Sequence, residues 1–306
     1  MTESNHMSRR GFLGRALAVG TSGFAASRAL AETGAPKPDT WPIGCYTRPW
    51  AAYDYRVALD AIAEAGYRFV GLMTTKSETN LVLSVKTTLE EANTIGEECQ
   101  SRGLVVPSVY GGGIPVAESL EAGIAGMRTL IDNCEAAHVG NLMMGGIGDE
   151  GLYDAYYKAI AESCDYAAAK GIGISVKPHG GLNSTGPQCR KIIEAVGQAN
   201  FRLWYDPGNI FYYSDGALDP VDDAATVDGL VVGMSVKDYE PPKKVDLTPG
   251  TGRVDFAKVM ARLKAGGFTH GPLIVECLAP GDLEQTLAEA KKARAFVEGI
   301  VGQLPA

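Results

Sequence analysis

The sequence predicts a single-domain (β/α)8 TIM barrel, an α/β fold, and three observations support this fold class. Eight short apolar or β-branched segments alternate with longer segments of helical periodicity. No long structureless linker interrupts this alternation in the 306-residue chain. Glycines such as Gly66, Gly103, Gly171 and Gly266 precede the apolar segments, where helix C-caps belong. A strand and helix repeated eight times favours a closed parallel barrel.

The expected strands are short runs rich in apolar and β-branched residues. In chain order they cover residues 43–46, 69–74, 105–110, 141–145, 173–177, 201–206, 230–237 and 272–276. An open α/β sheet is the competing architecture. However, no G-x-G-x-x-G motif follows the first run, as a dinucleotide-binding sheet would require.

The expected helices carry apolar residues three, four or seven positions apart. Candidates include residues 55–65, 88–102, 119–137, 152–170, 188–196, 255–265 and 283–301. Tyr153, Tyr156, Ile160, Cys164 and Ala167 illustrate this spacing in the fourth helix.

The N-terminal segment has the features of a twin-arginine export signal. Arg9 and Arg10 precede a weakly apolar run, and Ala29-Leu30-Ala31 resembles an A-x-A cleavage site. An amphipathic helix is the alternative, but several glycines and Arg15 disfavour it. We therefore expect a signal peptide at residues 1–31, a lead-in at 32–41, a catalytic barrel at 42–306, and a periplasmic location.

Composition limits the choice of partners. The formal net charge is −8, and loss of the arginine-containing signal would make it more negative. An acidic surface repels nucleic acid and anionic membranes, and it favours a neutral sugar over a sugar phosphate. No later apolar run approaches the roughly 20 residues that span a bilayer, so no membrane contact is expected after signal cleavage. A homo-oligomer is compatible with the sequence.

The six cysteines show no pattern of a structural zinc site, because they lack C-x-x-C spacing and neighbouring histidines. Export to an oxidising compartment permits disulfides but does not require them. We interpret these cysteines as small buried apolar side chains.

Polar side chains end four of the later expected strands, where the active sites of such barrels lie. Lys177 ends the fifth strand, Asp206 the sixth and Glu276 the eighth, while Ser235 or Lys237 ends the seventh. In a closed barrel these side chains would point into one mouth. Their charges then suit an acid/base or oxyanion-binding site.

These segments resemble the xylose isomerase-like barrel superfamily of sugar isomerases and epimerases, which also includes inosose dehydratases and related lyases. The resemblance covers nearly the whole chain after the signal. It rests on Tyr205-Asp206-Pro207-Gly208-Asn209, on Val236-Lys237-Asp238, and on the run from Pro249 to Phe256 that leads to Glu276. It implies proton transfer next to a sugar carbonyl through an enediolate.

The resemblance also implies a divalent metal ion (Mn, Mg or Co), with Asp206 and Glu276 as two ligands. Two further ligands do not match, because Lys177 stands where a glutamate is expected and Ser235 where a histidine is expected. Asn209 likewise replaces a frequent histidine. Two accounts therefore stay open, a metal-independent site in which Lys177 supplies the positive charge, and a weakened metal site.

Several residues receive expected roles in catalysis or substrate binding. His179 follows a strand end in a glycine-flanked loop, and its pKa near neutrality suits an acid/base partner for Glu276. Lys177 and Lys237 would stabilise an oxyanion. The expected substrate-binding residues are Asn209, Lys237, Arg253, Tyr46, Tyr110 and Ser235.

Three functions remain open from the sequence. The first is an isomerase or epimerase that acts on a small sugar or keto-sugar. The second is a lyase or dehydratase that acts on a keto-sugar or inosose, and the third is a non-catalytic sugar-binding barrel. Each takes a small-molecule carbohydrate as its ligand.

Overall fold

A computed structural model describes residues 41–304 of the chain. The predicted signal peptide at 1–31 and most of the lead-in at 32–41 therefore lie outside the described residues. Trp41, the last residue of that lead-in, packs edge-on against Phe268 with ring centroids 4.9 Å apart. The backbone of Pro42 accepts a hydrogen bond from Leu273, so this segment is tied to the last strand.

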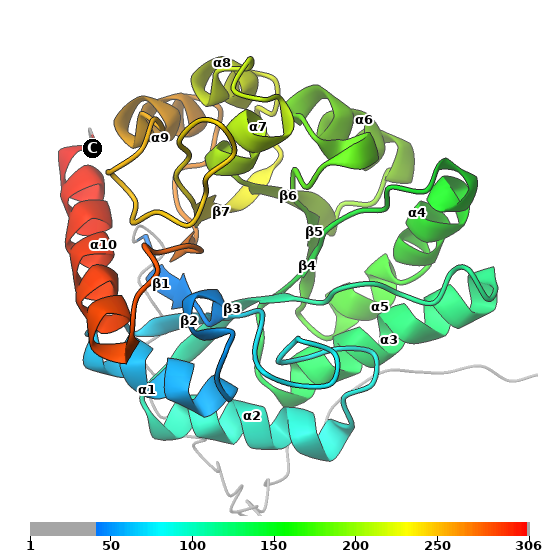
Figure 1. The fold of residues 1–306 in the computed structure, drawn as a ribbon. Coiled ribbons are helices and arrows are strands. Elements are labelled where there is room, and N and C mark those ends of the chain that lie inside the picture. Colours follow the sequence, from blue (N-terminus) through cyan, green and yellow to red (C-terminus); the bar gives the residue numbers. More distant parts are fainter. Residues whose placement is uncertain (1–40, 305–306) are drawn as a thin grey trace, which may run out of the picture. The chain divides into compact units, whose positions relative to one another are not determined.

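Eight parallel strands close into a barrel, because β1 pairs with both β2 and β8. Figure 1 shows the strands as an inner ring and the long helices around them. This confirms the predicted (β/α)8 barrel. The strands are β1 (Ile43–Tyr46), β2 (Phe69–Leu72), β3 (Val105–Tyr110), β4 (Asn141–Met144), β5 (Gly173–Val176), β6 (Phe201–Tyr205), β7 (Val231–Val236) and β8 (Leu273–Val275).

The α-helices mostly begin at side chains that cap their free N–H groups, such as Asp54, Thr88, Ser119 and Asp282. They are α1 (Tyr55–Glu64), α2 (Leu89–Ser101), α3 (Leu120–Ala136), α4 (Tyr153–Ala161), α5 (Cys164–Ala169), α6 (Gly186–Val196), α7 (Pro207–Tyr213), α8 (Pro220–Ala225), α9 (Phe256–Ala265) and α10 (Leu283–Gln303). Short 3-10 turns lie at Arg48–Trp50, Glu150–Leu152 and Gly181–Asn183.

The structure differs from the predicted helices in two places. The single helix expected over 152–170 is divided into α4 and α5. Ser163 at the break donates its hydroxyl to the carbonyl of Ala159, which competes with the regular helix bonds. The short helices α7 and α8 were not predicted, and α7 begins at the Asp206-Pro207 sequence that also suits an ordinary turn.

Two hydrophobic cores hold the barrel together. The larger one fills the space between the strands and the surrounding helices. The smaller one lies inside the barrel and consists of Tyr46, Met73, Met143, Trp204 and Ile274, with Tyr110 packed against it. Gly71 makes room for Tyr46, because a Cβ on this glycine would lie 2.1 Å from the tyrosine ring. This interior core closes the barrel below the strand ends.

The six cysteines are all buried and free. Burial raises the pKa of their thiols, to about 12 for Cys99, Cys164 and Cys277. Thiols in this state are poor nucleophiles. None of the helices within residues 41–304 combines the length and the apolar character needed to cross a membrane.

Candidate active site

A cavity of about 420 Å³ opens at the C-terminal ends of the strands, and we call it the barrel-mouth cavity. Its size falls within the roughly 300–1,000 Å³ of small-molecule sites. It is lined by Arg48, Met73, Thr74, Tyr110, Lys177, His179, Asn209, Tyr212, Tyr213, Lys237, Val245 and Glu276. The last residue of β3 and residues that follow β1, β2, β5, β6, β7 and β8 thus meet in one space.

Lys177 forms the centre of a buried charge network. Its Nζ donates to Oε2 of Glu276 at 2.6 Å and lies 2.8 Å from Oδ2 of Asp206. All three side chains are at most 2% exposed. Burial opposes the charge on Lys177, but the two carboxylates outweigh it and raise the lysine pKa. Lys177 therefore stays an ammonium ion at neutral pH.

Glu276 is the shared partner of three cations. Besides Lys177, it accepts hydrogen bonds on Oε1 from Lys237 Nζ at 2.9 Å and from Arg48 Nη1 at 2.9 Å. Burial works to raise its pKa, but Lys177, Lys237 and Arg48 together hold the pKa well below its usual range. A carboxylate held in this way accepts a proton poorly. This geometry favours an anchoring role for Glu276 over the acid/base role expected from the sequence.

Asp206 links the charge network to the backbone. It caps α7, and its Oδ1 accepts the backbone N–H of Asn209 at 2.9 Å. The Asn209 side chain in turn donates to the carbonyl of Pro178 at 2.6 Å. Asn209 lines the cavity and also fixes the loop that follows β5.

That loop presents His179 to the cavity between two tyrosine rings. The imidazole lies 5.9 Å from Tyr110 and 5.9 Å from Tyr213, measured between ring centroids. Asn183 stabilises the loop by donating to the carbonyls of Gly145 and Lys177. Gly180 has a φ of 89°, and a Cβ there would lie 2.6 Å from the Tyr213 ring. A glycine is thus required beside His179.

The environment of His179 keeps its imidazole neutral. The side chain is exposed to the cavity, yet the surrounding protein removes part of its hydration. Together with the nearby cations Lys177, Lys237 and Arg48, this lowers the pKa of His179 from 6.5 to about 4. At neutral pH the ring can accept a proton.

The other expected site residues lie in different places. Tyr46 and Ser235 are fully buried beneath the cavity, and the Tyr46 hydroxyl donates to Ser108 at 3.2 Å. Arg253 is not among the described residues that line the cavity. Its guanidinium covers the Phe211 ring at 4.5 Å and donates to the carbonyl of Gly216. A direct role in substrate binding is therefore better suited to Lys237, Tyr110 and Asn209.

Arg48 and Asp238 have roles that the sequence did not indicate. Arg48 reaches Glu276 because β1 and β8 are neighbours in the closed barrel. Asp238 is fully buried, although its pairing with Lys237 in the sequence resembles a solvated ion pair. Its carboxylate accepts the backbone N–H groups of Tyr239, Gly250, Gly252 and Val254, and so fixes both ends of the loop between β7 and α9.

The site does not fit a divalent metal ion. Among residues 41–304, no three or more His, Cys, Asp or Glu side chains form a group that could hold one. Lys177 Nζ already lies between Asp206 and Glu276, at the distances given above. Three cations compensate these two carboxylates, so a divalent ion would meet repulsion rather than free ligands.

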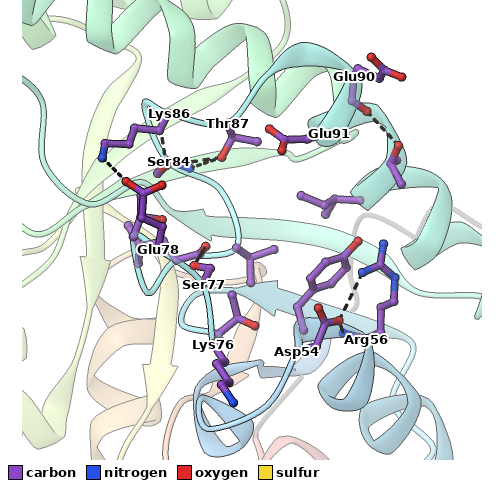
Figure 2. Close-up of a pocket in the computed structure, with 17 residues that line it drawn as sticks. Asp54, Arg56, Lys76, Ser77, Glu78, Ser84, Lys86, Thr87, Glu90 and Glu91 are labelled. Atoms are coloured by element: carbon purple, nitrogen blue, oxygen red, sulfur yellow. Dashed lines mark hydrogen bonds and ion pairs between the residues drawn. The ribbon is translucent and has the colours of Figure 1, made fainter.

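A second pocket of about 490 Å³ lies where α1 and α2 begin, under the loop after β2, and we call it the α1–α2 pocket. In Figure 2, Lys86 reaches Glu78 on one side, and Arg56 lies beside Asp54 on the other. These charged groups are largely exposed, with side-chain exposures of 44–81%. None of the sequence-predicted site residues lines this pocket.

Comparison with known proteins agrees with the barrel. The profile of the family described as xylose isomerase-like TIM barrel matches residues 59–298. A probable L-ribulose-5-phosphate 3-epimerase, UlaE, of Mycoplasma pneumoniae is 27% identical over 115 residues. These residues make up 36% of this chain and 36% of that relative, so the match spans about a third of its length.

Solved structures share the fold over most of the chain. A xylose isomerase domain protein from Planctomyces limnophilus is 20% identical, with a TM-score of 0.66 over 85% of this chain and 97% of that chain. D-psicose 3-epimerase, solved in the presence of D-fructose, is 15% identical, with a TM-score of 0.67 over 85% and 99%. A xylose isomerase-like TIM barrel protein from Mycobacterium smegmatis, in complex with magnesium, is 16% identical, with a TM-score of 0.66 over 86% and 97%.

Proposed function

Because the chain belongs to the xylose isomerase-like TIM barrel family, we propose that it is a sugar isomerase or epimerase. It moves a proton at the carbon next to the carbonyl of a small sugar or keto-sugar. The observation that carries this proposal is the position of Lys177, an ammonium ion buried between Asp206 and Glu276 in the cavity that His179 also lines. An acceptor for the proton and donors for the resulting oxyanion thus occur in one space.

The ammonium groups of Lys177 and Lys237 donate to the substrate carbonyl oxygen. When the adjacent C–H bond breaks, its proton passes to the neutral imidazole of His179, and the electron pair moves toward that oxygen. The negative charge that develops there offsets the effect of the nearby cations and raises the pKa of His179. Isomerisation follows when His179 returns the proton to the former carbonyl carbon and the neighbouring hydroxyl proton passes to the former carbonyl oxygen. Epimerisation follows when the original carbon instead takes a proton from solvent on its opposite face and His179 releases its own proton to solvent.

Asp206 and Glu276 serve as anchors in this proposal. They hold Lys177 and Lys237 in place and keep both side chains charged in a nearly dry site. Preorganised donors of this kind require little reorganisation when charge develops, which is the main source of oxyanion stabilisation in enzymes. In this mechanism the two lysines supply the positive charge.

Deuterium exchange tests the proposed reaction. The purified protein is incubated with a panel of keto-sugars in deuterated water, and we expect deuterium at a carbon next to the carbonyl. His179→Ala, with His270→Ala as a control at an exposed turn, identifies exchange that depends on the cavity. New double-bond absorbance would instead indicate the lyase alternative. Sugar binding without exchange would indicate a non-catalytic binding protein and refute the proposal.

Export through the twin-arginine route is a separate part of the proposal, supported by Arg9-Arg10 and the Ala29-Leu30-Ala31 site. Replacing both arginines with lysine should keep the protein in the cytoplasm at its unprocessed mass. Cell fractionation and mass spectrometry of the intact protein measure this directly. If the unmodified protein and the variant with both arginines replaced were recovered equally from the periplasm, this would contradict export by the twin-arginine route.

A further inference from the structure

We infer that the substrate of the barrel-mouth cavity is a sugar acid, which carries one carboxylate, rather than a neutral sugar or a sugar phosphate. This inference rests on the proposed function of the same cavity and names its substrate class. It comes from the charge balance of the cavity, from the chemistry of the proposed proton transfer, and from the donors that the protein leaves without an acceptor.

The charges around the cavity do not cancel. Lys177, Lys237 and Arg48 provide three positive charges, while Asp206 and Glu276 provide two negative ones. The lysines and carboxylates are at most 6% exposed at their side chains, and Arg48 is 30% exposed. Water therefore screens this excess of one positive charge only weakly.

The groups that line or contact the cavity do not remove the excess, and the buried Asp238 is not among the residues that line it, since its carboxylate is held by four backbone N–H groups of the loop after β7. His179 is neutral at pH 7, since its pKa is lowered to about 4. Asp246 lies 3.4 Å from Nη2 of Arg48, but its side chain is 65% exposed and faces solvent that screens it. The Cys277 thiol is protonated, because burial raises its pKa to about 12.

The proposed reaction cannot supply the missing negative charge. When a C–H bond of a neutral sugar breaks, the substrate becomes an enediolate with charge −1 and His179 becomes an imidazolium with charge +1. The net charge of the cavity and the substrate together is therefore unchanged. Only a substrate that enters with a negative charge cancels the excess, both in the bound state and in the transition state.

Two of the cations keep donors available for such an anion. Among the described residues, the ammonium of Lys237 has one hydrogen-bond acceptor, Oε1 of Glu276, although it carries three N–H groups. Arg48 donates to Glu276 through Nη1, and within residues 41–304 its Nη2 has one acceptor, the exposed Asp246 at 3.4 Å. Both side chains line the cavity. A carboxylate offers two charged oxygens that can each accept hydrogen bonds from such cationic donors.

The size of the excess favours a carboxylate over a phosphate. A phosphate monoester carries about −1.5 to −2 charges at neutral pH. It would therefore leave the cavity with surplus negative charge beside Asp206 and Glu276. A carboxylate carries one charge and balances the excess of one.

Isothermal titration of the full chain with D-glucuronate and D-glucuronamide tests this inference, because the two ligands have the same shape and differ in charge. We expect the acid to bind at least about 10-fold more tightly than the amide, with D-gluconate and D-glucose 6-phosphate as further probes. Equal binding of acid and amide, tighter binding of the phosphate, or no binding of either sugar acid would overturn the inference.

Two cavity variants, one of an arginine and one of a lysine, assign the preference to the cavity. Arg48→Gln should reduce the ratio of acid to amide affinity several-fold, and Lys237→Gln should do the same. Arg253→Gln is the matched control, since this arginine lies over Phe211 and does not line the cavity. If the ratio of acid to amide affinity stayed constant in both cavity variants, the sugar acid would bind outside the barrel-mouth cavity, which would contradict the inference.

The result separates this inference from the proposed function. If the protein bound the sugar acid more tightly than the amide but exchanged deuterium into no keto-sugar or keto-sugar acid, the proposed reaction would be refuted. The inference that the ligand is a sugar acid would still stand. Equal exchange into neutral keto-sugars and keto-sugar acids would keep the proposed reaction and refute the substrate class.

Discussion

The barrel-mouth cavity and the α1–α2 pocket are both lined by charged side chains, yet they differ in what surrounds those charges. Lys86 and Glu78 in the α1–α2 pocket lie 2.6 Å apart, and their side chains are 65% and 81% exposed. Lys177 and Asp206 in the barrel lie 2.8 Å apart and are 1% and 0% exposed. Similar distances thus occur in very different dielectric environments.

This difference decides what each pair can do. In water the attraction between two charges is largely cancelled by solvation, and exposed pairs contribute little to stability or to ligand binding. In the nearly dry barrel mouth, each charge depends on its neighbours and acts strongly on any group that develops charge nearby. Exposure, rather than distance, therefore distinguishes the candidate active site from the larger pocket.

Replacement of Lys177 with methionine should have the largest effect. Among the described residues, it leaves the buried carboxylate of Asp206 with one cationic partner, Lys237 at 3.9 Å, besides the N–H of Asn209. This should cost about 3–5 kcal/mol of unfolding free energy and abolish exchange activity. Urea unfolding measures the loss. Lys86→Met is the matched control and should change the unfolding free energy little. Similar losses of unfolding free energy in the two variants would contradict the proposed difference between the buried and the exposed ion pair.

His179→Ala should lower the exchange rate by about 10²–10⁴, the usual contribution of a general base. Its side chain is exposed to the cavity, so the unfolding free energy should change little. Kinetics and urea unfolding of the same samples check both expectations. Activity close to that of the unmodified protein would remove His179 from the mechanism.

The pH dependence of catalysis sharpens the comparison further. A base must be neutral to accept a proton, so activity is lost as the pH falls through the pKa of His179. Because that pKa is lowered to about 4, the acidic limb of kcat/KM should lie below 6.5, the ordinary value for histidine. The raised pKa of Lys177 and Lys237 keeps both charged, so these lysines produce no alkaline limb near neutrality. If the midpoint of the acidic limb of kcat/KM lay at or above pH 6.5, this would contradict the lowered pKa of His179.

Chelation should have the smallest effect. Because Lys177 occupies the space between the two carboxylates, overnight treatment with EDTA should leave exchange activity and thermal stability unchanged. Metal analysis of the untreated protein is the parallel measurement. Loss of activity on chelation, restored by Mn²⁺, Mg²⁺ or Co²⁺, would show that the carboxylates bind a metal and that Lys177 moves aside.

Much of the barrel could be predicted from local sequence, because each strand is a short apolar or β-branched run followed by an amphipathic helix. The position of Lys177, Asp206 and Glu276 at strand ends could be predicted for the same reason. Helix α7 was missed although Asp206 followed by Pro207 is a helix-start signal. Its seven residues are too few to show a clear helical period.

The remaining features of the site depend on contacts between distant segments. Arg48 pairs with Glu276 because the barrel closes between β1 and β8. No local sequence pattern predicts that these two distant strands are neighbours. The formal net charge of −8 suggested a neutral sugar, but the sum over the whole surface says little about the few charges inside one cavity. The low pKa of Glu276 likewise arises from three cations that converge only in the folded chain.

The carboxylate of Asp238 has a consequence for how this barrel could change its specificity. It holds the loop after β7 at its start, through Tyr239, and near its end, through Gly250, Gly252 and Val254. The tip between these anchors carries Val245 and Asp246 to the rim of the cavity. Evolution or a protein engineer could exchange that tip as a cassette, while the anchored ends keep the barrel beneath it intact.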